Sequence, residues 1–307
     1  MATLKGQNFR ILNIIEDEGR TSAEVFGMST NCVVTLTNNV ESSNTKDDVG
    51  LSDKPEVVSR AGSIQVETLN VADAAAFLEA VKTFKVFDLC WEETSTTDNQ
   101  TIVPAAIGRR AKAICNDLTL TFNNRESSGK NVQLTLLEAP YYYDRATAQS
   151  ILPLGSTTKG QYVRLFLGSD ATAVPGKVIS SAQQLSLHVS VAMESVSTKD
   201  TEGNWDRQEP TGLTYDITTN ALMRSGETIT SWVDGQAVAD IEAIHAAGLP
   251  VNWEIANVTG ANQRTKQTTI VSGKALLTQL TLNAGNRQTA TYDAQLNGYG
   301  DYVVVAA

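Results

Sequence analysis

The chain contains two similar stretches, CVVTLTNNVESSNTKDD at residues 32–48 and LSLHVSVAMESVSTKDT at residues 185–201. The second stretch lies 153 positions after the first. In each, apolar and polar residues alternate until a glutamate, Glu41 or Glu194, is reached. Because a period of two is typical of a half-buried strand, both stretches predict a strand that leads into a polar loop.

The similarity between the two stretches extends along most of the chain. Matching segments occur in the same order in both halves: Gly6-Gln7 and Gly160-Gln161, Trp91-Glu92 and Trp253-Glu254, Leu118–Leu120 and Leu280–Leu282. We interpret the halves as two copies of one domain, because collinear matches are typical of an internal repeat. The predicted boundaries are 1–135 for the first copy, 136–159 for a linker and 160–307 for the second copy.

Each copy is predicted to be a mainly β domain with one helix. The helical segments are VADAAAFLEAVKTF at residues 71–84 and GQAVADIEAIHAAG at residues 235–248. Asp73 is a candidate N-cap of the first helix, and Gly248 is a candidate stop after the second. Since the other periodic segments alternate as strands do, we expect a mostly antiparallel β-sandwich or barrel in each copy, with one helix packed on it.

Three polar or aromatic segments connect these elements. The polar stretches Glu41–Gly62 and Glu194–Gly212 are long for hairpin connections, and long connections in compact domains are often functional. The linker contains the run Tyr141–Tyr143. Because that run is aromatic, we expect it to pack either on a domain or on a neighbouring subunit.

The composition excludes several classes of protein. The formal net charge is −10, which argues against a protein that grips nucleic acid or an anionic membrane surface. The three cysteines, Cys32, Cys90 and Cys115, are widely spaced, which predicts reduced and mostly buried thiols in a protein made in the cytosol. The N-terminal segment is not apolar enough for a secretory signal, and no apolar run is long enough for a membrane anchor.

No catalytic, cofactor or metal site is predicted. The two histidines, His188 and His245, lie in a predicted strand and a predicted helix without a metal-binding pattern, so a structural role is favoured. Acidic clusters such as Glu16–Glu18 are interpreted as solvated surface. Ser272–Lys274 lacks the remainder of a phosphate-binding loop.

The second copy resembles the major tail protein (tail tube protein) family of long-tailed bacteriophages. The resemblance rests on the order of five features: Ser197–Asp200, Trp205, Thr211–Leu213, the helix near Ile241, and the closing segment Ser272–Gly300. The first copy has no tryptophan in the corresponding loop, and Ser-Arg-Ala-Gly replaces the Thr-Gly-Leu turn. The reading of the first copy therefore depends on the internal repeat.

This resemblance implies a tail-tube-like fold and a structural, non-enzymatic subunit that assembles with copies of itself into stacked rings. A duplicated subunit is expected to close a ring with three chains, which gives pseudo-sixfold symmetry. The ring encloses a channel through which DNA passes without specific binding. The implied partners are the tape measure protein and tail-end proteins, and the implied location is the virion tail, after assembly in the host bacterial cytoplasm.

The residues expected to contact neighbouring subunits or rings lie in the two polar stretches. They are Glu41, Lys46, Asp47, Asp48, Glu194, Lys199, Asp200 and Trp205. An alternative hypothesis is a two-domain β-sandwich that serves as a virion adhesin or glycan-binding module. Loops rich in Ser, Thr, Asp and Lys suit a polar protein interface better than a glycan site, which favours the first hypothesis.

Overall fold

The computed structural model describes most of the chain, in segments. They are residues 9–17, 20–25, 29–42, 55–69, 71, 73–93, 101–102, 109–142, 149–150, 157–172, 175, 177–179, 181–196, 205–223, 235–236, 238–259 and 265–305. The first half contains β1 (Phe9–Asp17), β2 (Arg20–Val25), β3 (Ser29–Ser42), β4 (Pro55–Thr68), α1 (Ala74–Lys82), β5 (Val86–Glu93), β6 (Thr101–Ile102), β7 (Arg109–Asn123), β8 (Gly129–Leu136), β9 (Tyr141–Tyr142) and β10 (Gln149–Ser150). The second half contains η2 (Gly160–Tyr162), β11 (Val163–Leu167), β12 (Lys177–Ile179), β13 (Ala182–Ser195), β14 (Gln208–Leu222), β15 (Gly235–Gln236), α2 (Val238–Ala247), β16 (Val251–Thr259), β17 (Thr265–Asn283), β18 (Thr291–Gly298) and β19 (Val303–Val304).

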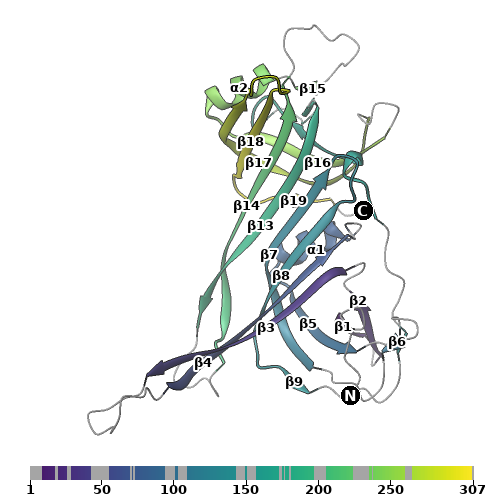
Figure 1. Cartoon of the computed structure of the whole chain (residues 1–307), viewed down its shortest axis with the longest axis vertical. Coiled ribbons are helices and arrows are strands. Elements are labelled where there is room, and N and C mark those ends of the chain that lie inside the picture. Colours follow the sequence, from purple (N-terminus) through teal and green to yellow (C-terminus); the bar gives the residue numbers. More distant parts are fainter. Residues whose placement is uncertain are drawn as a thin grey trace.

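One 17-stranded sheet passes through both halves (Figure 1). Its central part is a run of eight strands in the order β3, β4, β8, β7, β13, β14, β18, β17, and every neighbouring pair in it is antiparallel. We call this path the eight-strand run. The N-terminal parts of β7 and β17 pair instead with β5 and β16, which lead into side branches. The predicted mainly β class with one helix in each half is confirmed, whereas the continuity of the sheet between the halves was not predicted.

The two halves repeat the same pairings with the same irregularities. The β3–β4 ladder shifts register at residues 29–31 and 39–40, and the β13–β14 ladder shifts 153 positions later, at residues 182–184 and 192–193. These repeated β-bulges place each residue of β13 opposite the same neighbour position as its counterpart in β3.

The ladder between β7 and β8 repeats in the same way. It shifts register at residues 115–117, and the β17–β18 ladder shifts 162 positions later, at residues 277–279. The turns that follow β7 and β17 contain Arg125 and Arg287, which have φ angles of 66° and 60°. A positive φ is uncommon for arginine, so its recurrence at matching positions marks the same turn geometry.

The tryptophans matched in the sequence comparison do not occupy matching ladder positions. Trp91 lies opposite Ile11 and Arg109, and the residue at that place in the second half is Ile255, opposite Leu165 and Val271. The sequence match around Trp91 and Trp253 is therefore displaced by two residues. Both tryptophans are nevertheless buried, as expected for core residues.

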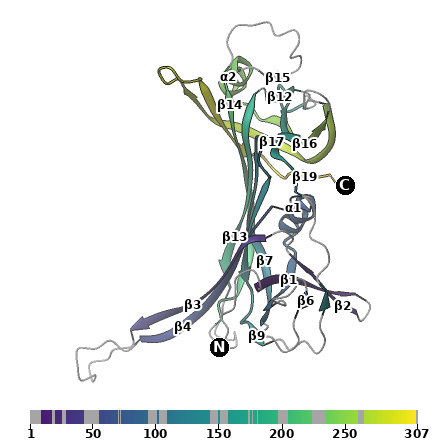
Figure 2. The same ribbon diagram turned by 45° about the vertical axis from the view of Figure 1, so that its right-hand side comes forward.

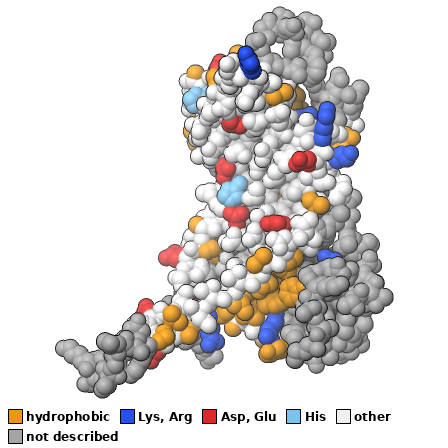
Figure 3. Space-filling view, viewed as in Figure 1, with side chains coloured by type: hydrophobic (Ala, Val, Ile, Leu, Met, Phe, Trp, Pro, Cys, Tyr) orange, Lys and Arg blue, Asp and Glu red, His pale blue; other side chains and the backbone are white. Residues whose placement is uncertain are grey.

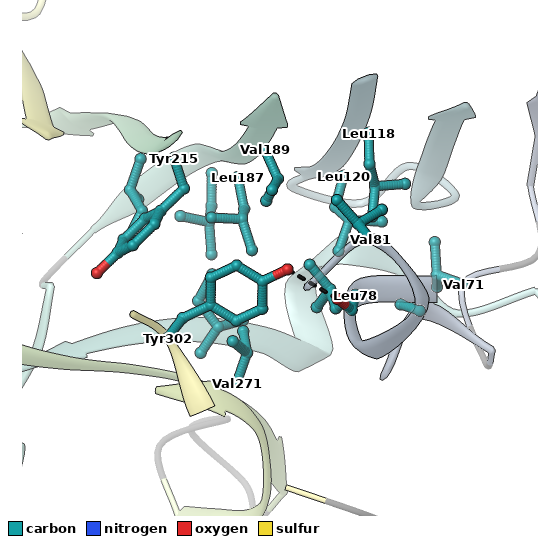
Figure 4. Packing of buried hydrophobic residues seen from close by; sticks show 14 of the residues in the cluster. Val71, Leu78, Val81, Leu118, Leu120, Leu187, Val189, Tyr215, Val271 and Tyr302 are labelled. Carbon is teal, nitrogen blue, oxygen red and sulfur yellow. Dashed lines mark hydrogen bonds between the residues drawn. The ribbon is translucent and has the colours of Figure 1, made fainter. Parts of the chain in front are cut away.

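The hydrophobic core is continuous between the halves. Leu118 and Leu120 of β7 pack beside Leu187 and Val189 of β13, and none of the four is more than 1% exposed (Figure 4). The hydroxyl of Tyr302, near the C-terminus, donates a hydrogen bond of 2.7 Å to the carbonyl of Leu78 in α1. The second half therefore fixes the helix of the first.

The residues that border the two helices have different roles. Gly248 follows α2 with a φ of 60°, which confirms the predicted stop because glycine adopts this conformation without strain. Asp73 does precede α1, but its side chain makes no capping hydrogen bond. Instead its carboxylate accepts from the buried Lys130 Nζ at 2.6 Å, which also lies over the ring of Phe77. Asp73 thus occupies the predicted N-cap position, but its side chain forms an ion pair that attaches α1 to β8.

Part of each long polar stretch is strand. β3 continues to Ser42 and β4 begins at Pro55, while β13 continues to Ser195 and β14 begins at Gln208. Thr211–Leu213, predicted as a turn, lies inside β14. Strand pairing extends further into both stretches than predicted, because the backbone pairs even where alternation is weak. Residues 43–54 and 197–204 lie outside the described residues.

The cysteines are free, as predicted. Cys90 and Cys115 are buried and Cys32 is partly buried. Burial raises the pKa of Cys115 to about 12 and raises the pKa of Cys32 as well. Across the described segments, no helix is long and apolar enough to span a membrane.

Candidate assembly surfaces

The junction between β7 and β13 joins the two halves, and we call it the internal seam. Residues 117–123 of β7 pair antiparallel with residues 184–190 of β13. A further backbone hydrogen bond of 2.8 Å runs from Asn124 N to Gln183 O. On one face the seam buries Leu118, Leu120, Leu187 and Val189. Strand pairing and apolar burial therefore act together along its whole length.

Gly160 lets the second half approach the end of this seam closely. A Cβ atom at this position would lie 2.3 Å from the carbonyl oxygen of Asn123, and the backbone N–H of Gly160 donates to Glu126 O at 2.9 Å. Such contact with backbone atoms excludes any larger residue. The sequence match between Gly6-Gln7 and Gly160-Gln161 identified this glycine without showing its role.

The other face of the eight-strand run is polar. Four adjacent rows of directly paired residues cross it: Gln65-Gln133-Asp117-Ser190-Thr214; Glu67-Asn131-Thr119-His188-Asp216-Asn297; Gly129-Thr121-Ser186-Thr218-Gln295-Gln279; and Asn123-Gln184-Asn220-Asp293-Thr281. We call this surface the polar face. Its four rows contain four acidic residues, one histidine and no lysine or arginine. Figure 2 shows α1 and the side branches on the opposite side of the sheet.

His188 bridges three strands of the polar face. Its Nε2 lies 2.7 Å from Asp117 Oδ2 on β7, and its Nδ1 lies 2.9 Å from Asp216 Oδ1 on β14. Partial burial lowers the pKa of His188. The hydrogen bonds and charges of the two carboxylates raise it by a larger amount, so the net pKa lies above its ordinary value. The predicted structural role of His188 fits this arrangement, because a ring held by two carboxylates cross-links the internal seam.

The eight-strand run ends in two strands with an unused edge. Among the described elements β3 pairs with β4 alone, and residues 276–283 of β17 pair with β18 alone. Leu36 on β3 is 55% exposed and Leu282 on β17 is 46% exposed. Their counterparts at the internal seam, Val189 and Leu120, are buried. An apolar strand with unpaired backbone groups is a template for another strand.

The β3–β4 hairpin projects from the body as an arm (Figures 1 and 2). Hydrophobic side chains continue along it from the lower part of the molecule (Figure 3). They include Val40 and Val58, which are 55% and 46% exposed. The matching hairpin, β13–β14, lies along the first half instead, so its apolar residues are largely covered.

Two of the candidate interface residues, Glu41 and Glu194, lie near the ends of these two hairpins. Glu41 pairs with Glu56, and Glu194 pairs with Glu209 at the matching position of the other hairpin. Each glutamate pair places two negative charges opposite each other near the end of a hairpin, where like charges repel. Lys46, Asp47, Asp48, Lys199 and Asp200 lie outside the described residues.

Trp205 contacts the first half of the same chain. It forms a parallel bridge with Arg60 of β4, and the backbone N–H of Asp206 donates to Arg60 O at 2.8 Å. A Cβ atom on Gly62 would lie 3.1 Å from the indole ring of Trp205. Trp205 was predicted to contact a neighbouring subunit or ring, and in the structure it contacts the other half of its own chain.

The aromatic linker run packs on the first half. Tyr141 and Tyr142 form β9, which pairs with β7, and the guanidinium of Arg109 lies 3.6 Å from the ring centroid of Tyr142. This is one of the two placements expected for the run; Tyr143 lies outside the described residues. The side chain of Tyr142 is 75% exposed, so one face of the stack remains open to solvent.

The described segments hold no cluster of three or more His, Cys, Asp or Glu residues with metal-binding geometry. The acidic residues of the polar face are separated by Thr, Ser, Asn and Gln. Two of these acidic residues, Asp117 and Asp216, form hydrogen bonds with His188. The surfaces defined above are therefore suited to strand pairing and to polar contact with solvent.

No family model matches the chain, and no curated protein matches it. Similar solved structures include a chain from the tail of an empty gene transfer agent (GTA) particle refined with C6 symmetry, at 13% identity and a TM-score of 0.38. A chain from the virion of a native GTA particle has 12% identity and a TM-score of 0.35. In both cases the match covers 48% of this chain and 99% of the other.

A third similar structure is the SPP1 tail tube, at 15% identity and a TM-score of 0.37, with 47% of this chain and 81% of the other covered. All three are tail or virion structures, the class that the second copy resembles in sequence. At these identities and TM-scores, the function has to be argued from the geometry of the chain itself.

Proposed function

We propose that this chain is a structural subunit of a bacteriophage tail tube, which assembles with copies of itself into stacked rings around a channel for the genome. One observation carries the proposal. In the described residues, the eight-strand run has one apolar face that is covered except on its outer strands, where Leu36 and Leu282 are exposed. Its other face is polar, with no lysine or arginine in the four rows, and an edge is unused at each end. A sheet with two complementary free edges extends by adding further copies.

The polar face suits the wall of a DNA channel. Proteins that hold DNA neutralise its phosphates with lysine and arginine, and each such contact slows release. The four rows of the polar face present hydroxyl, amide and carboxylate groups instead. DNA is therefore repelled weakly or left uncontacted as it passes.

The repeated pairing supports a ring of three chains. Each half contributes four matching strands to the run, β3-β4-β8-β7 and β13-β14-β18-β17. If the halves are copies of one ancestral domain, a closed ring of three chains contains six equivalent units. A head-to-tail contact of this kind closes into a ring when its rotation divides the circle.

The ends of the β3–β4 and β13–β14 hairpins are proposed to contact neighbouring subunits or the next ring. Glu41 and Glu194 lie near the tips of the two hairpins, followed in sequence by Lys46–Asp48 and Lys199–Asp200. Charge reversal at Glu41 and Glu194 tests this role. Shorter stacks of intact rings are expected by electron microscopy, because rim charges set how two surfaces meet. Stacks of unchanged length would exclude these two glutamates from ring contacts.

The proposed location is the virion tail, with the tape measure protein and tail-end proteins as further partners. The assembly itself is tested by concentrating the purified chain and imaging it in negative stain. Hollow tubes or stacked rings with threefold or pseudo-sixfold end views are expected. A chain that stays monomeric at high concentration would count against the tube, and glycan binding by that monomer would favour an adhesin.

A further inference from the structure

We propose that β17 of one copy pairs with β3 of the next copy in the register of the internal seam. This inference rests on the proposed self-assembly and adds the partner of each edge, the direction of pairing and the residues that meet. The occupant of each free edge is thus a second copy of this chain. The internal seam supplies the template for the contact.

Strand β17 corresponds to strand β7. Both strands have a register shift, at residues 277–279 and 115–117, and both are followed by an arginine with positive φ. Both also pair at their N-terminal parts with a short strand, β19 or β9, at matching positions. The free edge of β17 at residues 276–283 is therefore the counterpart of the β7 edge that β13 occupies.

Strand β3 corresponds to strand β13. Their ladders with β4 and β14 share two register shifts at positions 153 residues apart. In β13 the residues Leu185, Leu187 and Val189 are buried against β7 and the core. Their counterparts Cys32, Val34 and Leu36 lie on the uncovered edge strand β3, where Leu36 is 55% exposed. The burial that β13 obtains inside the chain is only partial for β3, because Cys32 and Val34 are partly buried and Leu36 is exposed.

Transferring the seam to the free edges gives one register. The pairs Leu185–Phe122, Leu187–Leu120 and Val189–Leu118 become Cys32–Ala284, Val34–Leu282 and Leu36–Leu280. These pairs place apolar side chains together on the face that is apolar in both strands. A shift by one residue would turn Val34 and Leu36 to the polar face and Thr35 and Thr37 to the apolar face, so this register is strongly preferred.

The opposite side of the same contact is uncharged. The seam pairs Ser190–Asp117 and His188–Thr119 become Thr37–Gln279 and Thr35–Thr281. No charged residue opposes another of the same sign, so nothing in this register repels the incoming strand. Because the histidine and its carboxylate partner are replaced, this contact lacks the titratable bridge of the internal seam.

A disulfide tests the register with a single substitution. Ala284 directly follows the last residue of β17, and the proposed pairing extends the strand by this one residue. In Ala284→Cys, the new thiol then lies directly opposite the native Cys32 of the next copy, where paired Cα atoms about 4.5–5.5 Å apart permit a disulfide. β3 and β17 lie at opposite ends of the eight-strand run, so this bond joins two chains and not one. Assembled tubes are treated with copper phenanthroline, because burial raises the pKa of Cys32 and spontaneous oxidation is slow.

Three variants serve as matched controls. In Asn283→Cys the thiol points to the other face of the sheet, and in Leu282→Cys it lies diagonally from Cys32, at about 7 Å. Adding Cys32→Ser to Ala284→Cys removes the partner thiol. Only Ala284→Cys is expected to cross-link, and its ladder on a non-reducing gel is expected to end at the covalent trimer.

Each other outcome overturns a defined part of the inference. Cross-linking by Leu282→Cys or Asn283→Cys, and not by Ala284→Cys, overturns the register. Tubes that form normally without any cross-link overturn the β17–β3 contact and leave the tube function in place. A monomer without tubes or cross-links overturns the proposed function and the contact together.

Discussion

His188 connects residue chemistry to the joining of the two halves. Its two ring nitrogens both contact carboxylate oxygens, of Asp117 and Asp216. Both nitrogens can donate at once only in the imidazolium form. The raised pKa of His188 means that folding favours this charged form. The charge therefore stabilises the internal seam where it is present.

We expect this contribution to disappear as the pH rises. It is complete below the unfolded histidine pKa of about 6.5 and is lost as the pH passes through the raised folded pKa. Since the ring is 37% exposed, solvent screening limits the effect to about 1 kcal/mol. Thermal unfolding at about pH 6 and about pH 9 checks this, with the difference between wild type and His188→Gln shrinking at the higher pH.

The control for this measurement is His245→Gln, which changes the other histidine, an exposed residue on α2. The bridge made by His188 stays intact in this variant, which is compared with wild type at the same two pH values. A His188→Gln variant that keeps the same stability difference at both pH values would show that His188 does not carry the bridge.

Gly160 makes a second prediction about a single residue. Gly160→Ala places a methyl group 2.3 Å from the carbonyl oxygen of Asn123, so the second half has to move away from the seam. We expect a loss of about 1–3 kcal/mol in the free energy of unfolding, measured by denaturant titration. Gly129→Ala is the matched control, because a Cβ there meets no atom within 4 Å. Equal losses in both variants would contradict the close approach.

The strands β3 and β13 are the clearest comparison between elements. They occupy matching positions, but β13 has a partner on both edges and β3 has one on a single edge. The same substitution in the two strands therefore has different consequences. Val189 is fully buried, whereas its counterpart Leu36 is 55% exposed.

We expect Val189→Glu to destabilise the fold by about 4 kcal/mol or more, because it buries an unpaired carboxylate. Leu36→Glu is expected to change the stability of the isolated chain by less than about 1 kcal/mol, because the side chain stays in water. It is nevertheless expected to block assembly, as seen by size-exclusion chromatography. Normal tubes of Leu36→Glu would exclude the β3 edge from the contact between copies.

At the scale of the whole molecule, the shared core predicts cooperative unfolding. Leu118, Leu187, Leu78 and Tyr302 come from both halves and belong to one buried cluster. We expect the Leu36→Glu monomer to unfold in one calorimetric transition, with calorimetric and van't Hoff enthalpies in agreement. Two separate transitions would show that each half is stable alone and that the internal seam is weaker than its burial indicates.

Much of the fold follows from the sequence because its signals are local. Period-two alternation predicted the strands that became β3 and β13, and the segments predicted as helices became α1 and α2. Gly248 ends α2 as predicted, since a positive φ is a property of a single residue. The order of matched segments also indicated the repeat, and the recurring register shifts support it.

The sequence did not indicate which distant groups would meet. Asp73 was predicted as an N-cap, but its carboxylate pairs with Lys130, 57 positions away. Trp205 contacts Arg60 of the other half, and the Trp91 match was displaced by two residues. Composition and spacing contain no information about these contacts, because they depend on how the strands are stacked.

Side-chain period and backbone preference act within a short window, so the helices and the strands that became β3 and β13 can be predicted from the residues alone. The pairing of β13 with the edge of β7, and the free outer edges of β3 and of residues 276–283 of β17, are visible only in the folded chain. Every strand edge offers the same backbone donors and acceptors. The choice among edges is made by the burial of Leu118, Leu120, Leu187 and Val189, which exists only once the halves are folded together.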